Sequence, residues 1–291
     1  MQTRPVRSAS QRVAPAPKLG IIAGGGELPG RLEDACRAGG RDRFVLAFNG
    51  VGSVESVTPD AWVDIGRVSD TFALLHEAKC EEIVLAGPIR RPKLSALRLD
   101  KRGRSMLAKF TRVWGRDDAL LSLIVHELED EGFRVVGADD VLGELLASEG
   151  PLGRLVPGEQ AAADMKLGVR VIAALGTLDI AQAVVVQQGR VLGIEAAEGT
   201  DALIERCSHL QVEDGPRAVL VKLQKPGQER RVDLPAIGAA TVERAAEAGF
   251  AGIAIESGGT LVMDQRGVIE SADKAGLFVV AITPNWQSMD T

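Results

Sequence analysis

The chain has 291 residues, the length of one large domain or two ordinary ones. Its hydrophobic content is 45%, but aromatic residues make up only 3%, so packed cores must be built from Val, Ile, Leu and Ala. That composition is typical of α/β layers. The formal net charge of −6 disfavours a nucleic-acid-binding protein, which usually carries a basic surface.

Residues 1–17 contain three arginines together with Ser, Pro and Gln, and no acidic residue. They lack the apolar centre of a signal peptide, so we interpret them as a disordered leader, with an organellar transit peptide as the alternative. No apolar run in the sequence approaches the roughly 20 residues that span a bilayer. The cysteines Cys36, Cys80 and Cys207 lie far apart, which favours a reducing cytosol and disfavours a disulfide framework or a zinc site.

The first half of the chain alternates short apolar runs with amphipathic stretches. Strands are predicted at 18–24, 43–48, 62–68, 82–86 and 133–137, and helices at 28–38 and 70–79, twice between 88 and 131, and after 139. Strands that alternate with helices at this spacing predict a parallel sheet covered on both faces. We therefore expect an N-terminal Rossmann-like parallel α/β domain over 18–147.

Residues 148–157 are rich in Gly and Pro and are predicted to be a linker. Beyond them the rhythm changes, and we expect a C-terminal mixed α+β catalytic domain over 158–291. Helices are predicted at 160–175, 201–207, 240–248 and 268–275, and strands at 181–187, 191–196, 217–225, 230–234, 252–256, 260–263 and 277–282.

A glycine turn, Gly24-Gly25-Gly26, separates the first predicted strand from the first helix. Bare backbone N–H groups at a helix N-terminus suit phosphate binding. A dinucleotide site is disfavoured because Pro29 occupies the third glycine position of the fingerprint and Asn49-Gly50 replaces the expected acidic residue. Two interpretations stay open, a phosphate or nucleotide contact of another kind and a purely structural turn.

Three carboxylates and a hydroxyl, those of Glu195, Glu198, Thr200 and Asp201, fall within seven residues at a strand-to-helix junction. Hard oxygen ligands so placed suit Mg²⁺ or Mn²⁺. Ordinary helix capping would explain Thr200 and Asp201, but it would not explain Glu195, which lies in an otherwise apolar strand.

The stretch 222–238, KLQKPGQERRVDLPAIG, places cations beside one isolated aspartate, Asp233. Lysines and arginines neutralise phosphate oxygens, and a carboxylate can hold a metal ion or activate water. The alternative is an exposed pair of strands with solvated charges. Gly258-Gly259-Thr260, after Glu256, forms another tight turn at a strand end. The motifs of two-metal phosphoesterases, Nudix pyrophosphatases and serine esterases are missing.

From residue 18 onward the chain resembles the LpxI-type UDP-2,3-diacylglucosamine pyrophosphatases of Gram-negative bacteria. Glu229 departs from that pattern, since the family more often has aspartate there, and the leader lies outside the resemblance. The motifs that carry it are LGIIAGGGELP at 19–29, GRDDALL at 115–121, LGTLDIAQAVVV at 175–186, IEAAEGTDALIERC at 194–207 and KPGQERRVDLPAIG at 225–238.

The resemblance implies Mg²⁺-dependent hydrolysis of the pyrophosphate bond of UDP-2,3-diacylglucosamine to UMP and 2,3-diacylglucosamine 1-phosphate (lipid X), in the pathway to lipid A. It also implies two domains with the substrate between them, a homodimer, and peripheral contact with the cytoplasmic face of the inner membrane. The essential aspartate of the family matches Asp233. The two acyl chains need a hydrophobic channel, which we expect in the cleft between the domains.

Residue chemistry and resemblance together give a mechanistic hypothesis. Asp233 holds the metal ion or activates the water, and one or more of Glu195, Glu198 and Asp201 help to hold the metal, with Mn²⁺ as an alternative ion. Lys225 and Arg231 offset the phosphate charge. The predicted substrate contacts are Gly25, Gly26, Asp118, Gln182, Thr200, Lys225 and Arg231.

Two other functions remain open on the sequence. One is a nucleotide-sugar enzyme that binds a cofactor on the Rossmann-like domain through the glycine turn. The other is a regulatory protein that binds a UDP-sugar without reaction. Release of UMP from the diacylated substrate separates the hydrolase from both.

Overall fold

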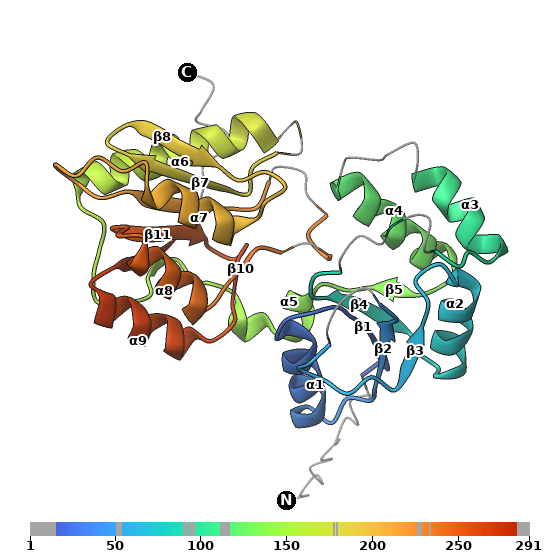
Figure 1. Ribbon diagram of the computed structural model, residues 1–291. Helices are drawn as coiled ribbons and strands as arrows, with labels where there is room; N and C mark the ends of the chain where they lie inside the picture. Colours follow the sequence, from blue (N-terminus) through green and yellow to red (C-terminus); the bar gives the residue numbers. More distant parts are fainter. Residues whose placement is uncertain are drawn as a thin grey trace, which may run out of the picture.

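The computed structural model describes residues 16–50, 54–89, 93, 97–110, 117–176, 178, 180–225, 229–232 and 234–283, apart from the side chains of Asp117 and Asp118. These residues form two α/β units, each built around its own sheet (Figure 1). In this part of the chain no helix combines the length and the apolarity needed to cross a bilayer.

The N-terminal sheet has five parallel strands in the order β3-β2-β1-β4-β5. This is the order of a Rossmann-like sheet, as predicted. The strands after β1 are added on one side of it as far as β3 and then on its other side from β4, so the order reverses between β1 and β4. The loops after these two strands therefore diverge and leave a crevice at their carboxyl ends. The strands are β1 (Leu19–Ala23), β2 (Arg43–Phe48), β3 (Ala61–Val63), β4 (Glu82–Ala86) and β5 (Arg134–Val135).

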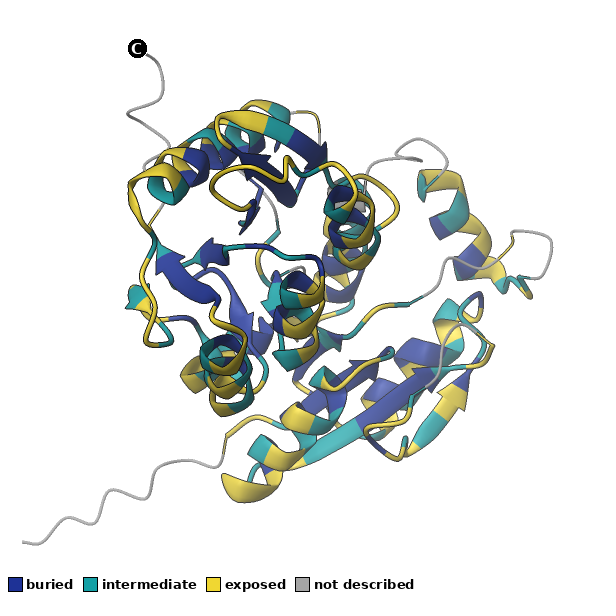
Figure 2. Ribbon diagram, turned by 60° about the vertical axis from the view of Figure 1, so that its left-hand side comes forward, coloured by how far each residue is buried: buried dark blue, intermediate teal, exposed yellow. Residues whose placement is uncertain are grey.

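Helices cover both faces of this sheet, so its central strands are buried on both sides (Figure 2). Alternate residues of β1 divide between the two cores: Ile21 packs with α1 (Leu28–Ala38) and α5 (Ala138–Val141), and Ile22 packs with α2 (Val68–Glu77) and α4 (Asp117–Asp130). Helix α3 (Lys101–Phe110) packs against α2 on the second face. Aliphatic strands are what this doubly covered geometry requires.

The C-terminal sheet has six strands in the order β6-β13-β11-β9-β7-β8. The three central strands β13, β11 and β9 are parallel, whereas β6, β7 and β8 run antiparallel to their neighbours, which confirms the predicted mixed sheet. The strands are β6 (Gly150–Pro151), β7 (Ala183–Gln187), β8 (Arg190–Ile194), β9 (Val219–Lys222), β11 (Gly252–Glu256) and β13 (Phe278–Ile282).

One long helix covers one face of this sheet and three shorter helices cover the other. Helix α6 (Glu159–Gly176) contributes Met165, Val169 and Ile172 to the first core. The second core is built with α7 (Thr200–Ser208), α8 (Ala239–Glu247) and α9 (Gln265–Ala275).

A small two-stranded sheet joins the two units. Its strands β10 (Ala236–Ile237) and β12 (Leu261–Val262) pair in parallel. Leu261 is buried within the apolar core of the N-terminal sheet, and Leu234 and Met263 pack against that core. The two units therefore share apolar surface where they meet.

Two segments differ from the prediction. Residues 148–157 were predicted to be a linker, but Gly150–Pro151 forms β6 at the edge of the C-terminal sheet, and Arg154 forms an ion pair with Asp273 at 3.0 Å. The predicted strand at 230–234 is wrong, because residues 230–232 form a turn in which Val232 N–H donates to Glu229 O at 3.2 Å. These residues have no neighbouring strand to pair with in the described part of the chain, so they form a turn instead of an extended strand.

The loops after β1 and β4 approach too closely for any side chain. A Cβ atom on Gly87 would lie 2.0 Å from Gly25 O, and Gly87 has φ +84°. Gly87→Ala should therefore destabilise the fold by more than the roughly 1–2 kcal/mol that left-handed backbone costs an L-residue. Urea unfolding measures this loss. The matched control is Gly40→Ala, at φ +64° with nothing within 4 Å, and an equal loss in both variants would contradict the steric argument.

Candidate functional site

A cavity of about 1280 Å³ lies at the carboxyl ends of β1, β2 and β4 and is lined by residues of both units. Ile22, Phe48 and Leu85 come from the ends of these strands. From the second half of the chain, residues between 180 and 264 complete the lining. The cavity therefore occupies the crevice that the Rossmann-like strand order creates.

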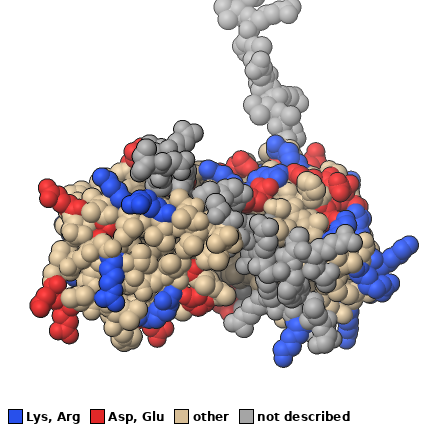
Figure 3. Space-filling view, turned by 90° about the horizontal axis from the view of Figure 1, so that it is seen from above, with Lys and Arg blue, Asp and Glu red and all other residues tan. Residues whose placement is uncertain are grey.

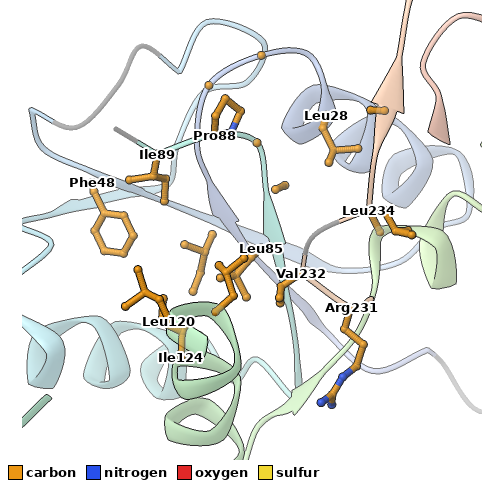
Figure 4. Close-up of a pocket in the computed structure, with 18 of the residues that line it drawn as sticks. Leu28, Phe48, Leu85, Pro88, Ile89, Leu120, Ile124, Arg231, Val232 and Leu234 are labelled. Atoms are coloured by element: carbon orange, nitrogen blue, oxygen red, sulfur yellow. The ribbon is translucent and has the colours of Figure 1, made fainter. Parts of the chain in front are cut away.

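Most of the lining is aliphatic. Figure 4 shows Phe48, Ile89, Leu120 and Ile124 gathered on one side of the cavity, with Leu234 on the other. Helix α3 adds Met106, Leu107 and Phe110, and α4 adds Leu121 and Leu128. This apolar compartment lies mainly inside the N-terminal unit, between its sheet and the helices α2, α3 and α4, and it continues to the junction of the two units. The hydrophobic channel was predicted in the cleft between the domains, but only the end of the apolar compartment lies there.

Polar groups gather where the two units meet. Six of the predicted site residues line the cavity together, although they come from distant parts of the sequence: Gly25, Gly26, Gln182, Glu195, Lys225 and Arg231. Arg31 and Arg230 line it as well. One continuous cavity thus has an apolar compartment and a polar end.

The glycine turn has a structural role that accounts for part of its composition. Gly24 N–H donates to Ala86 O at 2.7 Å and Gly25 N–H donates to Pro88 O at 2.9 Å, so these two amides already bond the loop after β4. Gly26 has φ +77° and its carbonyl oxygen accepts from Ser56 Oγ at 2.7 Å. Of the two predicted glycine contacts, the Gly25 amide is engaged within the protein in this conformation.

Glu195 follows directly after β8, and a chain of two hydrogen bonds fixes one oxygen of its carboxylate. Thr200 Oγ1 donates to Glu195 Oε1 at 2.9 Å, and Lys222 Nζ donates to Thr200 Oγ1 at 3.0 Å. Gly199, and not Thr200, is the residue that caps α7. The capping interpretation of Thr200 is therefore wrong, and its hydroxyl instead joins a lysine to a carboxylate.

The other oxygen of this carboxylate, Glu195 Oε2, is buried and has no hydrogen-bond partner within the described structure. Gln182 Nε2 is likewise buried without a partner there, and both residues line the cavity. A buried polar atom left without a partner costs about 1–3 kcal/mol. One acceptor and one donor that carry this cost at a single cavity indicate a site that binds a polar ligand.

The other two predicted metal ligands are engaged elsewhere. Glu198 forms an ion pair with Arg206 at 2.9 Å, and Asp201 forms an ion pair with Arg244 at 3.4 Å. Hydrogen bonds from its own backbone N–H and from Arg206 hold the pKa of Glu198 below its ordinary value. Among the described residues, no three His, Cys, Asp or Glu side chains come together as a metal site.

Arg231 bridges the two units. It donates to both oxygens of Glu229, at 2.9 and 2.8 Å, and to Glu129 of α4 at 2.5 Å. The hydrogen bonds to Glu229 raise the pKa of Arg231 far above its ordinary value and lower the pKa of Glu229. Arg230 forms a second bridge, to Asp139 of α5 at 3.3 Å. In this conformation both guanidinium groups are committed to carboxylates.

Lys225 is 8% exposed and lines the cavity, as expected of a substrate contact. The chain just before it is fixed to β11, because Gln224 N–H donates to Glu256 Oε2 at 2.9 Å. Burial raises the pKa of Glu256. This contact ties Glu256, which precedes the predicted turn Gly258-Gly259-Thr260, to the loop that carries Lys225.

Two predicted residues cannot be located from their side chains. Asp233 lies outside the described residues, but its neighbours Val232 and Leu234 both line the cavity. Asp118 belongs to the first turn of α4, and its side chain is outside the description. Sequence reasoning also missed Arg31 and the aliphatic lining from α3 and α4. Apolar spacing in α4, at Leu120, Ile124 and Leu128, was a usable signal, although it does not distinguish a core from a cavity wall.

The fold and the site together define a two-domain α/β protein with a Rossmann-like N-terminal unit and an amphiphilic cavity at the junction. Comparison with known proteins specifies this class further. The LpxI N-terminal domain family matches residues 18–145, and the LpxI C-terminal domain family matches residues 148–280. The chain belongs to the LpxI family.

A relative from Caulobacter vibrioides (strain ATCC 19089 / CIP 103742 / CB 15), named UDP-2,3-diacylglucosamine pyrophosphatase LpxI, is 42% identical over 274 residues. The match covers 92% of this chain and 98% of the relative. A solved ADP complex of purK, an N5-carboxyaminoimidazole ribonucleotide synthetase, matches with a TM-score of 0.23 and 12% identity over 65% of this chain and 40% of its own. That likeness is too slight to inform the fold or the function.

The Lys222–Thr200–Glu195 chain can be tested without an activity assay. Thr200→Val removes the donor to Glu195 Oε1 and an acceptor of Lys222 in one step, so we expect a loss of about 1–3 kcal/mol in the free energy of unfolding. Thr200→Ser keeps the hydroxyl and should stay close to the parent protein in urea denaturation. Equal stability of the Val and Ser variants would contradict the proposed hydrogen-bond chain.

Proposed function

We propose that this protein hydrolyses the pyrophosphate bond of UDP-2,3-diacylglucosamine and releases UMP and 2,3-diacylglucosamine 1-phosphate, a step in the biosynthesis of lipid A. The observation that carries the proposal is one continuous cavity with an aliphatic compartment and a polar end. A diacylated nucleotide sugar has the same division. The name of the Caulobacter relative, which describes this substrate, supports the assignment.

The aliphatic compartment suits the two acyl chains. Each methylene that leaves water contributes about 0.8 kcal/mol, so long chains supply much of the binding energy. The side chains that would surround them come from α3, α4 and the ends of β2 and β4, for example Leu107, Phe110, Ile124, Phe48 and Leu85. The sugar and the diphosphate would then lie at the junction of the two units, beside Lys225.

The polar end supplies groups for the diphosphate and the uridine. Lys225 is the buried cation at this end, and its charge would offset that of the phosphate oxygens. Gln182 Nε2 is a donor without a partner in the described structure and would bind a substrate oxygen. Gly26 at the end of β1 is a further candidate contact. Arg231 would contact phosphate only after exchanging one of its carboxylate partners.

The residues at this end fit a magnesium ion in part. Glu195 Oε2 is a hard oxygen at the cavity without a partner in the described structure, which suits Mg²⁺ or Mn²⁺. Glu198 and Asp201 fit less well because arginines engage them. We propose that Glu195 and Asp233 hold the ion, which when bound would neutralise charge on the diphosphate.

Asp233 is the proposed catalytic residue. It either accepts the proton of the attacking water or positions the metal ion. Attack on one phosphorus breaks the phosphoanhydride bond, and the other phosphate leaves with the bridging oxygen. Lys225 is largely buried, which would strengthen its interaction with phosphate charge.

We further propose a homodimer, which the family resemblance implies. We also propose that it lies in the cytoplasm in peripheral contact with the inner membrane, because the substrate and the product both carry acyl chains. A cofactor-binding enzyme and a UDP-sugar-binding protein without activity are the rival functions. Saturable binding of the diacylated substrate without release of UMP would identify the second of these.

Asp233→Ala should bind UDP-2,3-diacylglucosamine yet lose about 10³-fold or more in turnover, because a metal-holding or water-activating group is removed. Release of UMP, followed with Mg²⁺ and then with EDTA, measures this. Asp214→Ala is the control, since Asp214 is an exposed carboxylate. Near-normal turnover by Asp233→Ala would refute the catalytic role.

Ile124→Trp should fill part of the aliphatic compartment. Loss of room for about two methylenes predicts a fall of roughly tenfold in kcat/KM for the long-chain substrate. An analogue with acetyl groups in place of the long chains should be affected little. Ser122→Trp places the same side chain on the exposed face of α4 and is the matched control. An equal fall for both substrates would argue against acyl binding in this compartment.

A further inference from the structure

The stretch 89–116 concentrates positive charge in an acidic protein. It contains ten of the 34 Lys and Arg residues of the chain and only one of its 40 Asp and Glu residues. The described residues of this stretch are the approach to α3 and the helix itself. Like charges so close in the sequence repel one another, and an anionic partner would relieve that repulsion.

Helix α3 is amphipathic and firmly attached at its N-terminus. Asp100 accepts from Ser69 N at 2.7 Å and from Gly103 N at 2.6 Å, which fixes the first turn. Burial raises the pKa of Asp100, but these hydrogen bonds outweigh it and leave the pKa below its ordinary value. The inner face of the helix is part of the cavity wall, through Leu107 and Phe110.

The outer side of this region is different. Two of its cations are neutralised, since Arg102 forms an ion pair with Glu131 and Lys109 forms one with Glu127. Four others are exposed and form no ion pair with any described residue: Lys93, Arg98, Lys101 and Arg104. We call these four residues the basic surface. Figure 3 shows Lys and Arg atoms gathered at the right-hand end of the molecule, the end at which α3 lies in Figure 1.

Two exposed apolar side chains of the C-terminal unit lie at or near the same cavity. Leu178 is 65% exposed and Ile180 is 41% exposed, and Ile180 lines the cavity together with Leu107 and Phe110. Both belong to the turn that closes α6, where Leu178 N–H donates to Leu175 O at 2.9 Å. Cations beside exposed aliphatic side chains are the combination that binds an interfacial membrane surface.

We propose that the basic surface, which lies on α3 and on the segment before it, docks this protein on an anionic phospholipid surface, with Leu178 and Ile180 entering the headgroup region. Lysines and arginines would bind lipid phosphates while the apolar wall of the same helix faces the cavity. An acyl chain could then pass from the bilayer into the compartment behind α3 without crossing open water. This last step rests on the proposed function, but the charge and the exposure do not.

A nucleic acid fits these observations less well. Single-stranded nucleic acids bind through aromatic stacking as well as charge, whereas the exposed apolar residues described beside this cavity, Leu178 and Ile180, are aliphatic. Each cation near an anionic bilayer is expected to contribute about a fivefold gain in binding. The basic surface as a whole would therefore matter even though the net charge of the chain is negative.

The test is flotation of the full chain with vesicles of phosphatidylcholine alone and with a third of phosphatidylglycerol. We expect binding only to the anionic vesicles, and weaker binding in 0.5 M salt. Lys101→Gln combined with Arg104→Gln should lower the partition coefficient about 25-fold. The control is Arg266→Gln with Lys274→Gln, which removes the same charge from α9, at the opposite corner of Figure 1, and should bind like the parent.

Unchanged binding of the α3 variant, an equal loss in the α9 variant, or equal binding to neutral vesicles would overturn the proposal. So would tighter binding to a 20-nucleotide RNA than to anionic vesicles at equal phosphate concentration. Hydrolysis of substrate dispersed in detergent micelles should be the same for the α3 variant and the parent. Because vesicle binding is measured without substrate, an inactive parent protein that still floats would refute only the proposed function.

Discussion

The polar end of the cavity exists only while the two units stay together, and the contact that holds them combines a shared apolar core with two arginine bridges. Leu234, Leu261 and Met263 belong to the second half of the chain but pack into the N-terminal core. Exposed ion pairs contribute little, usually below about 1 kcal/mol each. The apolar contact therefore supplies most of the attraction, and the bridges from Arg230 and Arg231 fix its orientation.

These bridges also explain how the charged turn at 229–232 can join the two units and, at the same time, hold residues at the cavity. The pKa of Glu229 is lowered and that of Arg231 is raised, so the pair stays charged from mildly acidic to strongly alkaline conditions. A carboxyl group whose pKa is lower in the folded than in the unfolded state stabilises the fold at pH values above its unfolded pKa. This stabilisation is lost as the pH falls through the folded pKa. The turn is thus secured at neutral pH without a buried strand, and its two flanks, Val232 and Leu234, remain at the cavity.

The sequence predicted the periodic parts of the structure best. Aliphatic runs such as 82–86 and glycine turns located the strands of both sheets, because burial on two faces leaves an unambiguous pattern. It failed at 230–232, where residues without a partner strand in the described structure form a turn, and at 150–151, where pairing with β13 depends on distant residues. Two-residue strands such as β10 carry no periodicity at all.

The candidate site shows the same difference between what local sequence predicts and what depends on tertiary packing. Glu195 and Lys225, singled out by residue chemistry, and Gln182, taken from the family resemblance, all line one cavity. Polar groups at the strand ends of one sheet edge tend to converge, but their roles toward a substrate stay predictions. Residue chemistry could not show that Arg206 and Arg244 engage Glu198 and Asp201, because those partners come from helix positions whose direction depends on tertiary packing. Likewise, apolar spacing cannot tell whether a helix face fills a core or lines a cavity.

The distribution of charge follows from the same arrangement. Helix α3 needs an apolar inner face because it walls the cavity, and a helix so exposed on its outer face can carry any polar residue there. Neutral or mixed charges would satisfy solubility equally well. Lys93, Arg98, Lys101 and Arg104 are nevertheless all cationic and form no ion pair with a described residue, in a chain with more acidic than basic residues. The proposed anionic phospholipid surface would account for this charge, and it would bring acyl chains to the face behind which the apolar compartment lies.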